Sequence, residues 1–423
     1  MILDLDGDGI ELTATGDPSV YFDIAGDQFA GQGGGVGPGG GGVGERRDRW
    51  GCACGARRGA GGAREARGAA GSVGSASGGS VRADVVHSRG DARTRMGEDG
   101  IGCTVTSVED DYGNDGLTWR RIRGTYTVPL YVDSPDPPAK FVRDVDGMPA
   151  YQEDTEIEFT MIIPRTLADT GAPGPLITFG HGLLGTGEGT VSMGSVRDIA
   201  QRGEVVLLAT DWDGMSSEDV PTVGLALADP SNFTYVTERL QQGMVNQIAM
   251  TRTFGGVCSD LEEFYSGDVN LVDTSAHYYT GVSQGGIYGG TLVTLSPDID
   301  RGVLLVNGVV FPFMMERSID YAPYLPLFEF AWPDRLDQAL LLPLAQHLWD
   351  ASEPSGYLAH LRDGLTGIGP KEVLSIAVVN DAQVPNLSTD QAMRMVDVPV
   401  VLLSSLLPFF FLSFSFPLLS LSS

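Results

Sequence analysis

The sequence predicts an α/β fold built on a mostly parallel central sheet with helices on both faces. Short runs of β-branched and aliphatic residues recur through residues 101–397, and stretches with helical spacing of apolar residues lie between them. Several of these runs, such as LITF, VVLLA and VLLV, are apolar without a break, as expected for strands that are buried on both faces. The chain of 423 residues is also long enough for one large domain of this type.

The individual elements follow from these runs in chain order. Strands are predicted at 156–164, 175–180, 204–210, 277–282, 302–310 and 373–380. One helix is predicted at 190–202 and another at 234–253, where Leu240, Met244 and Ile248 are spaced along one helical face. A third helix is expected to begin just after Ser283.

Two N-terminal segments differ from this region. Residues 30–100 are rich in Gly, Ala and Arg with almost no periodic apolar residues, so we expect disorder; an RNA-binding tract would need interleaved aromatic residues. Residues 1–29 carry Asp4, Asp6 and Asp8 with the spacing of a calcium loop. An EF-hand is rejected because its twelfth position is Thr15 rather than Glu. The segment resembles haemolysin-type Asp/Gly-rich calcium repeats, which implies a weak calcium site; a solvated acidic turn is the alternative.

The C-terminal tail, residues 398–423, carries no charged side chain. Its length and hydropathy alone would favour a membrane anchor, but Pro399, Pro408 and Pro417 oppose a regular spanning helix. Its Leu, Ser, Phe and Pro content is also that of a translated polypyrimidine tract. We favour this reading, an aberrant or truncated end, over an anchor or an ordinary buried terminus.

Composition excludes several partners. A formal net charge of -28 opposes binding to nucleic acid and to an anionic membrane surface. The first residues lack a basic stretch followed by an apolar one, so no signal peptide is predicted in the chain as printed. The four cysteines do not form a metal-binding pattern, and the sequence leaves a Cys103–Cys258 bridge open.

The stretch GVSQGG, residues 281–286, is the strongest candidate for chemistry. Gly281 and Gly285 flank Ser283 as required for a serine on a sharp turn between a strand and a helix. Upstream, FGHGLLG places Gly182 and Leu183 after a predicted buried strand. The backbone N–H groups of Leu183 and Gln284 are therefore predicted to form an oxyanion hole.

Together, FGHGLLG and the later GVSQGG resemble the α/β-hydrolase superfamily, on its lipase and esterase side. The span 140–397 is similar to secreted or surface-attached bacterial lipases and esterases. The resemblance implies a serine nucleophile, an acid and a histidine in that chain order, and hydrolysis of a small-molecule or lipid ester through an acyl-enzyme. It implies no cofactor for catalysis, and a helical cap in the apolar insertion at about 311–361.

Asp381 is the predicted triad acid, because VLSIAVVND ends a strand where this family carries its carboxylate. A turn or helix-cap role is the alternative for Asp381. Asp211 and Asp213 end another strand in ATDWDG and are weaker candidates, in a loop expected to line the pocket.

The triad histidine is missing from its expected place. None of the five histidines follows Asp381. His181 precedes the nucleophile and is predicted to have a hydrogen-bonding role in its loop, whereas His360 would need a rearranged topology. The remaining three are His87, His277 and His347.

One hypothesis joins the missing histidine to the unusual tail. In the resembling family the histidine follows the last strand, which would begin near residue 398, where the tail starts. We hypothesise that the intact gene encodes a histidine beyond Val401 that this chain has lost; an uninterrupted transcript encoding the tail as printed would contradict it. The chain is then either a carboxylic-ester hydrolase or a catalytically impaired, hydrolase-like binding or surface protein.

Overall fold

The computed structural model describes residues 80–396 and 400–403. The three N-terminal aspartates of the predicted calcium loop, the predicted disorder of residues 30–79 and the tail beyond residue 403 lie outside the described residues. The described strands are β1 (Cys103–Asp110), β2 (Thr118–Leu130), β3 (Glu153–Pro164), β4 (Gly174–Gly180), β5 (Val206–Ala209), β6 (Tyr265–Ser266), β7 (Val269–Asn270), β8 (Val272–Val282), β9 (Arg301–Leu305), β10 (Glu372–Val378) and β11 (Val400–Leu403). The described α-helices are α1 (Ser80–Met96), α2 (Arg165–Thr170), α3 (Gly187–Val191), α4 (Gly194–Gly203), α5 (Val220–Ala228), α6 (Phe233–Gly255), α7 (Gln284–Leu295), α8 (Phe311–Met315), α9 (Leu325–Ala331), α10 (Arg335–Trp349), α11 (Ala359–Asp363) and α12 (Asn386–Val396).

The predicted fold class is confirmed by the main sheet. Its strands follow the order β1-β2-β3-β5-β4-β8-β9-β10-β11. Strands β1, β2 and β3 pair antiparallel, as do β3 and β5, while all pairs from β5 through β11 are parallel. The carboxyl ends of β4, β8 and β10 therefore share one edge, where ligands bind in open sheets of this kind.

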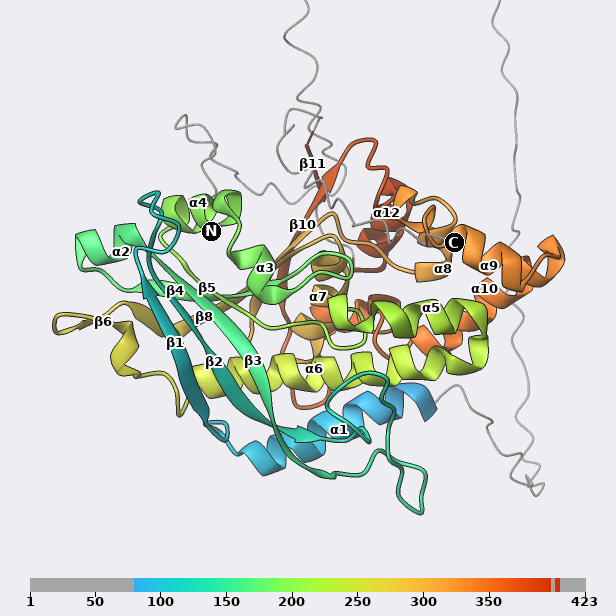
Figure 1. Ribbon diagram of the computed structural model, residues 1–423, viewed down its shortest axis with the longest axis horizontal. Helices are drawn as coiled ribbons and strands as arrows, with labels where there is room; N and C mark the ends of the chain where they lie inside the picture. The colour runs from blue at the N-terminus through green and yellow to red at the C-terminus, as the bar shows by residue number, and fades with distance from the viewer. Residues whose placement is uncertain (1–79, 397–399, 404–423) are drawn as a thin grey trace, which may run out of the picture. The chain divides into compact units, whose positions relative to one another are not determined.

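Helices cover both faces of the sheet, as Figure 1 shows with α3 and α4 on one side and α6 and α1 on the other. On the α4 side, Val196 and Ala200 pack against strand residues that include Ile177 and Leu207. On the α6 side, a larger cluster joins α6 and α7 to the cap helices and α12. Burial on both faces explains why the central strands read as unbroken apolar runs.

The cap and the elbow helix lie where the sequence places them. The insertion at about 311–361 contains α8, α9, α10 and the start of α11, with 3-10 turns at Ile319–Tyr321 and Pro354–Gly356. Helix α7 begins immediately after Ser283, and α6 spans the helix predicted at 234–253.

Several boundaries differ from the sequence prediction. Residues 80–96, which were predicted to be disordered, form helix α1, because Val85, Ala92 and Met96 place a buried face on this helix despite its Arg-rich sequence. The helix predicted at 190–202 is interrupted at Ser192 and forms α3 and α4. Strand β9 ends at Leu305, because Val306 takes a positive φ of 46° that a strand does not allow.

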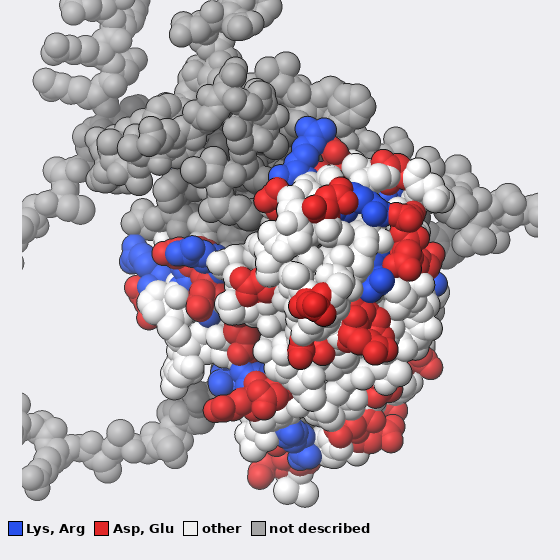
Figure 2. Space-filling model, turned by 90° about the vertical axis from the view of Figure 1, so that its left-hand side faces the viewer, with Lys and Arg blue, Asp and Glu red and all other residues white. Residues whose placement is uncertain are grey.

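The open cysteine pairing is settled by a disulfide between Cys103 and Cys258. It joins the start of β1 to the segment after α6, 155 residues later in the chain. No described helix is long and apolar enough to cross a membrane. Figure 2 shows one face of the molecule, on which acidic side chains predominate and basic side chains form small groups, as the net charge leads us to expect.

Candidate functional site

Ser283 occupies a strained turn between β8 and α7. Its backbone has φ 58° and ψ -120°, a conformation that L-residues rarely adopt. Two backbone hydrogen bonds hold the turn: Ser283 N–H donates to the Leu305 carbonyl (3.1 Å), and the Ile287 N–H donates to the Ser283 carbonyl (2.9 Å). The sequence thus places this serine on a sharp strand-to-helix turn, as GVSQGG predicts.

The glycines of the motif allow α7 to approach the sheet closely. A Cβ at Gly285 would overlap the carbonyl of Gly180, at the end of β4. A Cβ at Gly281 would overlap the backbone of Gly285 and the Tyr279 hydroxyl, which donates to the Gly285 carbonyl (2.5 Å). Backbone cannot move away as a flexible side chain can, so these positions accept only glycine without a shift of the helix.

The loop after β4 lies against the turn. The Gln284 side chain accepts a hydrogen bond from the Leu184 N–H (3.4 Å) and donates one to the Met215 carbonyl (2.9 Å). This amide therefore links the turn to the loops after β4 and β5, a role that the sequence analysis did not predict. The Leu183 N–H has no acceptor among the described residues, and the Gln284 N–H begins α7, where no carbonyl of the helix can accept it. Whether the two point at one oxygen remains a prediction.

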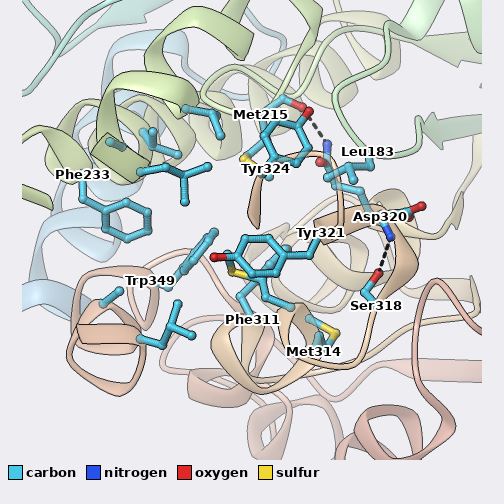
Figure 3. A pocket seen from close by; sticks show the side chains of 18 of the residues that line it. Leu183, Met215, Phe233, Phe311, Met314, Ser318, Asp320, Tyr321, Tyr324 and Trp349 are labelled. Atoms are coloured by element: carbon cyan, nitrogen blue, oxygen red, sulfur yellow. Dashed lines mark hydrogen bonds between the residues drawn. The ribbon is translucent and has the colours of Figure 1, made fainter. Parts of the chain in front are cut away.

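Ser283 lines a cavity of about 250 Å³ beneath the cap. Figure 3 shows the cavity lined by side chains of the cap, with Met215 and Phe233 from the other wall. Phe311 stacks on Trp349 with ring centroids 4.6 Å apart, and Phe233 meets Trp349 edge-on at 4.7 Å. Such a lining favours an apolar ligand, since few polar groups offer hydrogen bonds. The polar residues of the lining are Ser283, Gln284, Ser318, Asp320, Tyr321, Tyr324 and Gln383.

His181 has the hydrogen-bonding role that its position suggested. Its Nε2 accepts from the Trp212 N–H (2.7 Å), so the ring hydrogen lies on Nδ1, which donates to the Gly182 carbonyl (2.8 Å). Burial lowers the pKa of His181 to about 4, so the ring is neutral at pH 7. Both nitrogens are occupied, and His181 fixes its loop rather than facing Ser283.

None of the five histidines lines the cavity that contains Ser283. His277, on β8, is buried beside Thr178, whose hydroxyl lies 2.9 Å from its Nε2, and burial lowers its pKa to about 3. His87 and His347 are exposed on α1 and α10, and His360 is half-buried on α11. The structure therefore brings no histidine of the described residues to the nucleophile.

Asp381 lies after β10, two strands from β8 along the same edge of the sheet. Its Oδ1 accepts from the N–H groups of Gln383 (2.8 Å) and Val384 (2.9 Å), which is the turn role of the alternative prediction. Oδ2 has no hydrogen bond within the described part of the chain. Burial is the main cause that raises the pKa of Asp381, and the two backbone hydrogen bonds oppose it. The acid role is untested.

Asp211 and Asp213 lie away from the Ser283 cavity, although their loop reaches it through Met215. Both aspartates line a separate polar cavity of about 530 Å³. Asp211 accepts from the Gly187 N–H (2.6 Å), and Asp213 accepts from the Asn246 amide (2.6 Å). Their contacts hold the loop after β5 in place.

A buried ion pair completes the anchoring of this loop and was missed by the sequence analysis. The Arg239 Nε donates to Asp219 at 2.8 Å, and its Nη2 lies 3.2 Å from Asp213. Asp219 also accepts from the N–H groups of Gly214 (2.8 Å) and Ser216 (3.0 Å). The sequence signal was SSED before a helix, which is typical of a capping box.

Replacing Asp211 by asparagine is expected to change the pH dependence of stability. Burial above all raises the pKa of Asp211 to about 7, against a usual value of 3.8, so the folded state binds the extra proton between these pH values. Asp211 therefore adds to the free energy of unfolding below about pH 4, and this contribution is lost as the pH rises to 7. Asparagine keeps an acceptor for the Gly187 N–H and cannot ionise.

The variant should be more stable than the unchanged protein above pH 7 by about 1 kcal/mol or more, and the gain should vanish near pH 4. Urea unfolding from pH 4 to 8 measures this, with Asp268→Asn in the exposed β6–β7 turn as the control. Equal pH slopes for Asp211→Asn and the unchanged protein would contradict the prediction.

No group of three or more His, Cys, Asp or Glu side chains within residues 80–396 and 400–403 is arranged to hold a metal ion. The chemistry that the described site offers is that of a serine hydroxyl beside two N–H groups and an apolar cavity.

No family model and no curated protein matches the chain. Among solved structures, acetyl xylan esterase from Paenibacillus sp. R4 is 15% identical with a TM-score of 0.44, covering 76% of this chain and 87% of that one. Acetyl xylan esterase 1 from Thermoanaerobacterium sp. JW/SL YS485 is 13% identical with a TM-score of 0.43, covering 77% and 86%. An S-formylglutathione hydrolase from Agrobacterium tumefaciens is 14% identical with a TM-score of 0.38, covering 71% and 90%.

Proposed function

We propose that the fold of this chain is that of a carboxylic-ester hydrolase in which Ser283 is the nucleophile. The observation that carries the proposal is the strained backbone of Ser283, with φ 58° and ψ -120°, at the wall of a largely apolar cavity. Strain of this kind persists only where the surrounding structure enforces it, and it clusters at active sites. The enforcing contacts are the close packing of Gly285 on β4 and the hydrogen bond from Ser283 to Leu305.

The mechanism follows the atoms of the site. The Ser283 Oγ adds to the carbonyl carbon of the ester, and the negative charge that develops on the carbonyl oxygen is stabilised by the N–H groups of Leu183 and Gln284. Loss of the alcohol leaves an acyl-enzyme, which water then hydrolyses. The apolar cavity holds the hydrocarbon part of the ester, so its desolvation contributes to binding.

As the Ser283 Oγ adds to the ester, a base must take its proton and return it to the departing alcohol. In the family that the chain resembles this base is a histidine after the last strand, oriented by an acid for which Asp381 is our candidate. That place lies beyond residue 403, where the printed sequence contains no histidine. Loss of the base in a serine hydrolase costs about 10⁶-fold in kcat and leaves a residual rate from the oxyanion hole and binding. The second candidate function is therefore a hydrolase-like binding protein, and the absence of histidine from the lining of the Ser283 cavity favours it.

A fluorophosphonate probe separates the two functions, because the rate at which it bonds to a serine rises with the reactivity of the hydroxyl and with oxyanion-hole stabilisation. We expect slow labelling of the full chain, located at Ser283 by peptide mapping, and its loss in Ser283→Ala. Ser275→Ala, which removes an exposed serine of the same strand, is the control and should label normally. A folded chain that takes no label at any probe concentration would reject the hydrolase and support the binding protein.

A further inference from the structure

Tyr321 is a buried polar residue in the wall of the apolar cavity. It ends the 3-10 turn Ile319–Tyr321 of the cap, and its side chain is 8% exposed. Phe328 and Leu342 pack against its ring. Figure 3 shows the ring among the lining side chains with its hydroxyl directed toward the interior of the lining.

The hydroxyl of Tyr321 has no hydrogen-bond partner within the described residues. A buried donor without a partner costs about 1–3 kcal/mol, which a phenylalanine of the same shape would avoid. The other deeply buried tyrosine hydroxyls do have partners, and these residues are Tyr126, Tyr131, Tyr279, Tyr288 and Tyr357. Tyr321 is thus the exception among the buried tyrosines of residues 80–396.

The nearby polar groups satisfy one another and leave Tyr321 aside. The Asp320 carboxylate accepts from the Gln383 amide at 3.0 Å, and the Asp320 N–H donates to Ser318. Burial, followed by the charges of Glu316 and Glu329, raises the pKa of Tyr321 to about 12. The phenol therefore keeps its proton at physiological pH and offers a donor to whatever occupies the cavity.

We propose that the Tyr321 hydroxyl donates a hydrogen bond to a second oxygen atom of the ligand. The preferred ligand class is then an apolar ester with an ether or keto oxygen in its chain, apart from the ester group that faces Ser283. This inference depends on the proposed function only for the ester group of the ligand, which faces Ser283. In the complex, the second oxygen of the ligand becomes the hydrogen-bond partner of Tyr321. A ligand without this oxygen leaves the Tyr321 hydroxyl unpaired, and the free-energy cost of that unpaired donor separates the affinities of the two ligands.

Binding measurements on Ser283→Ala test this without any turnover. The probes are ethyl decanoate and a series of ethyl oxodecanoates of equal chain length in which the keto group moves along the chain. Quenching of tryptophan fluorescence reports occupancy, because Trp349 lines the cavity. We expect one keto position to bind about tenfold more tightly than ethyl decanoate, and Tyr321→Phe to remove that preference while binding ethyl decanoate at least as well.

Tyr324→Phe is the matched comparison, since Tyr324 lines the same cavity but is only half-buried. It should affect both esters alike. A Ser283→Ala cavity without preference, or a preference that survives when Tyr321→Phe is added, overturns the inference and leaves the proposed function standing. Failure of both esters to bind overturns both. Binding with the expected preference but no serine labelling supports the role of Tyr321 and rejects only the hydrolytic reaction.

Discussion

Replacing Asp219 by alanine is expected to lower the free energy of unfolding by about 3–5 kcal/mol. The Asp219 side chain is fully buried, and its removal leaves the Nε of Arg239 without an acceptor. It also leaves the N–H groups of Gly214 and Ser216 unpaired inside the protein. Removing one partner of a buried pair is costly because the other charge stays desolvated. Urea or thermal unfolding of the full chain measures the loss.

The effect should extend to Ser283. The loop that Asp219 anchors also presents the Met215 carbonyl to the Gln284 side chain, so a loosened loop should reduce fluorophosphonate labelling. Glu218→Ala, at the exposed neighbouring position, is the control and should change the free energy of unfolding by no more than about 0.5 kcal/mol. Similar losses for Asp219→Ala and Glu218→Ala would show that the ion pair does not anchor the loop.

Local patterns allowed much of the fold to be predicted from the sequence. Strands β4 and β5 are buried on both faces and were visible as unbroken apolar runs. Strand β9 was visible in the same way, although one of its faces is only partly buried. Strand β2 was missed because Arg120, Arg121 and Arg123 interrupt its apolar pattern, and its pairing with β1 and β3 depends on residues far away in the chain. Helix α1 was missed for a related reason, since its stability comes from packing on α6 rather than from its own composition.

The candidate site shows the same contrast between features set by local sequence and features set by contacts distant in the chain. Ser283 and its glycines form one contiguous motif, so short-range sequence was enough to predict the turn. The contacts of Gln284 with two loops and the buried ion pair of Arg239 join segments that the chain separates widely, and no local pattern identifies them. Tyr321 could not be singled out, because it lies in an apolar insertion where an aromatic residue is expected simply to pack in the core.

Gly285→Ala is expected to abolish labelling of Ser283 almost completely. The new methyl group would overlap the carbonyl of Gly180, and neither the end of β4 nor the first turn of α7 can turn aside as a side chain could. Relief requires helix α7 to move away from the sheet, which displaces Ser283 and the Gln284 N–H together. A displacement near 1 Å can cost about 100-fold in rate, so labelling should fall by at least about that factor.

The matched control is Gly224→Ala, a glycine of α5 whose added Cβ meets nothing within 4 Å. Alanine there should raise the free energy of unfolding by about 0.5–1 kcal/mol through the lower entropy of the unfolded chain, and labelling should persist. Unfolding and labelling are measured on both variants, so a Gly285→Ala protein that is folded but unlabelled ties the loss to the geometry of the turn. A Gly285→Ala protein that labels like the unchanged chain would show that the close approach of α7 to β4 is not required for the reactivity of Ser283.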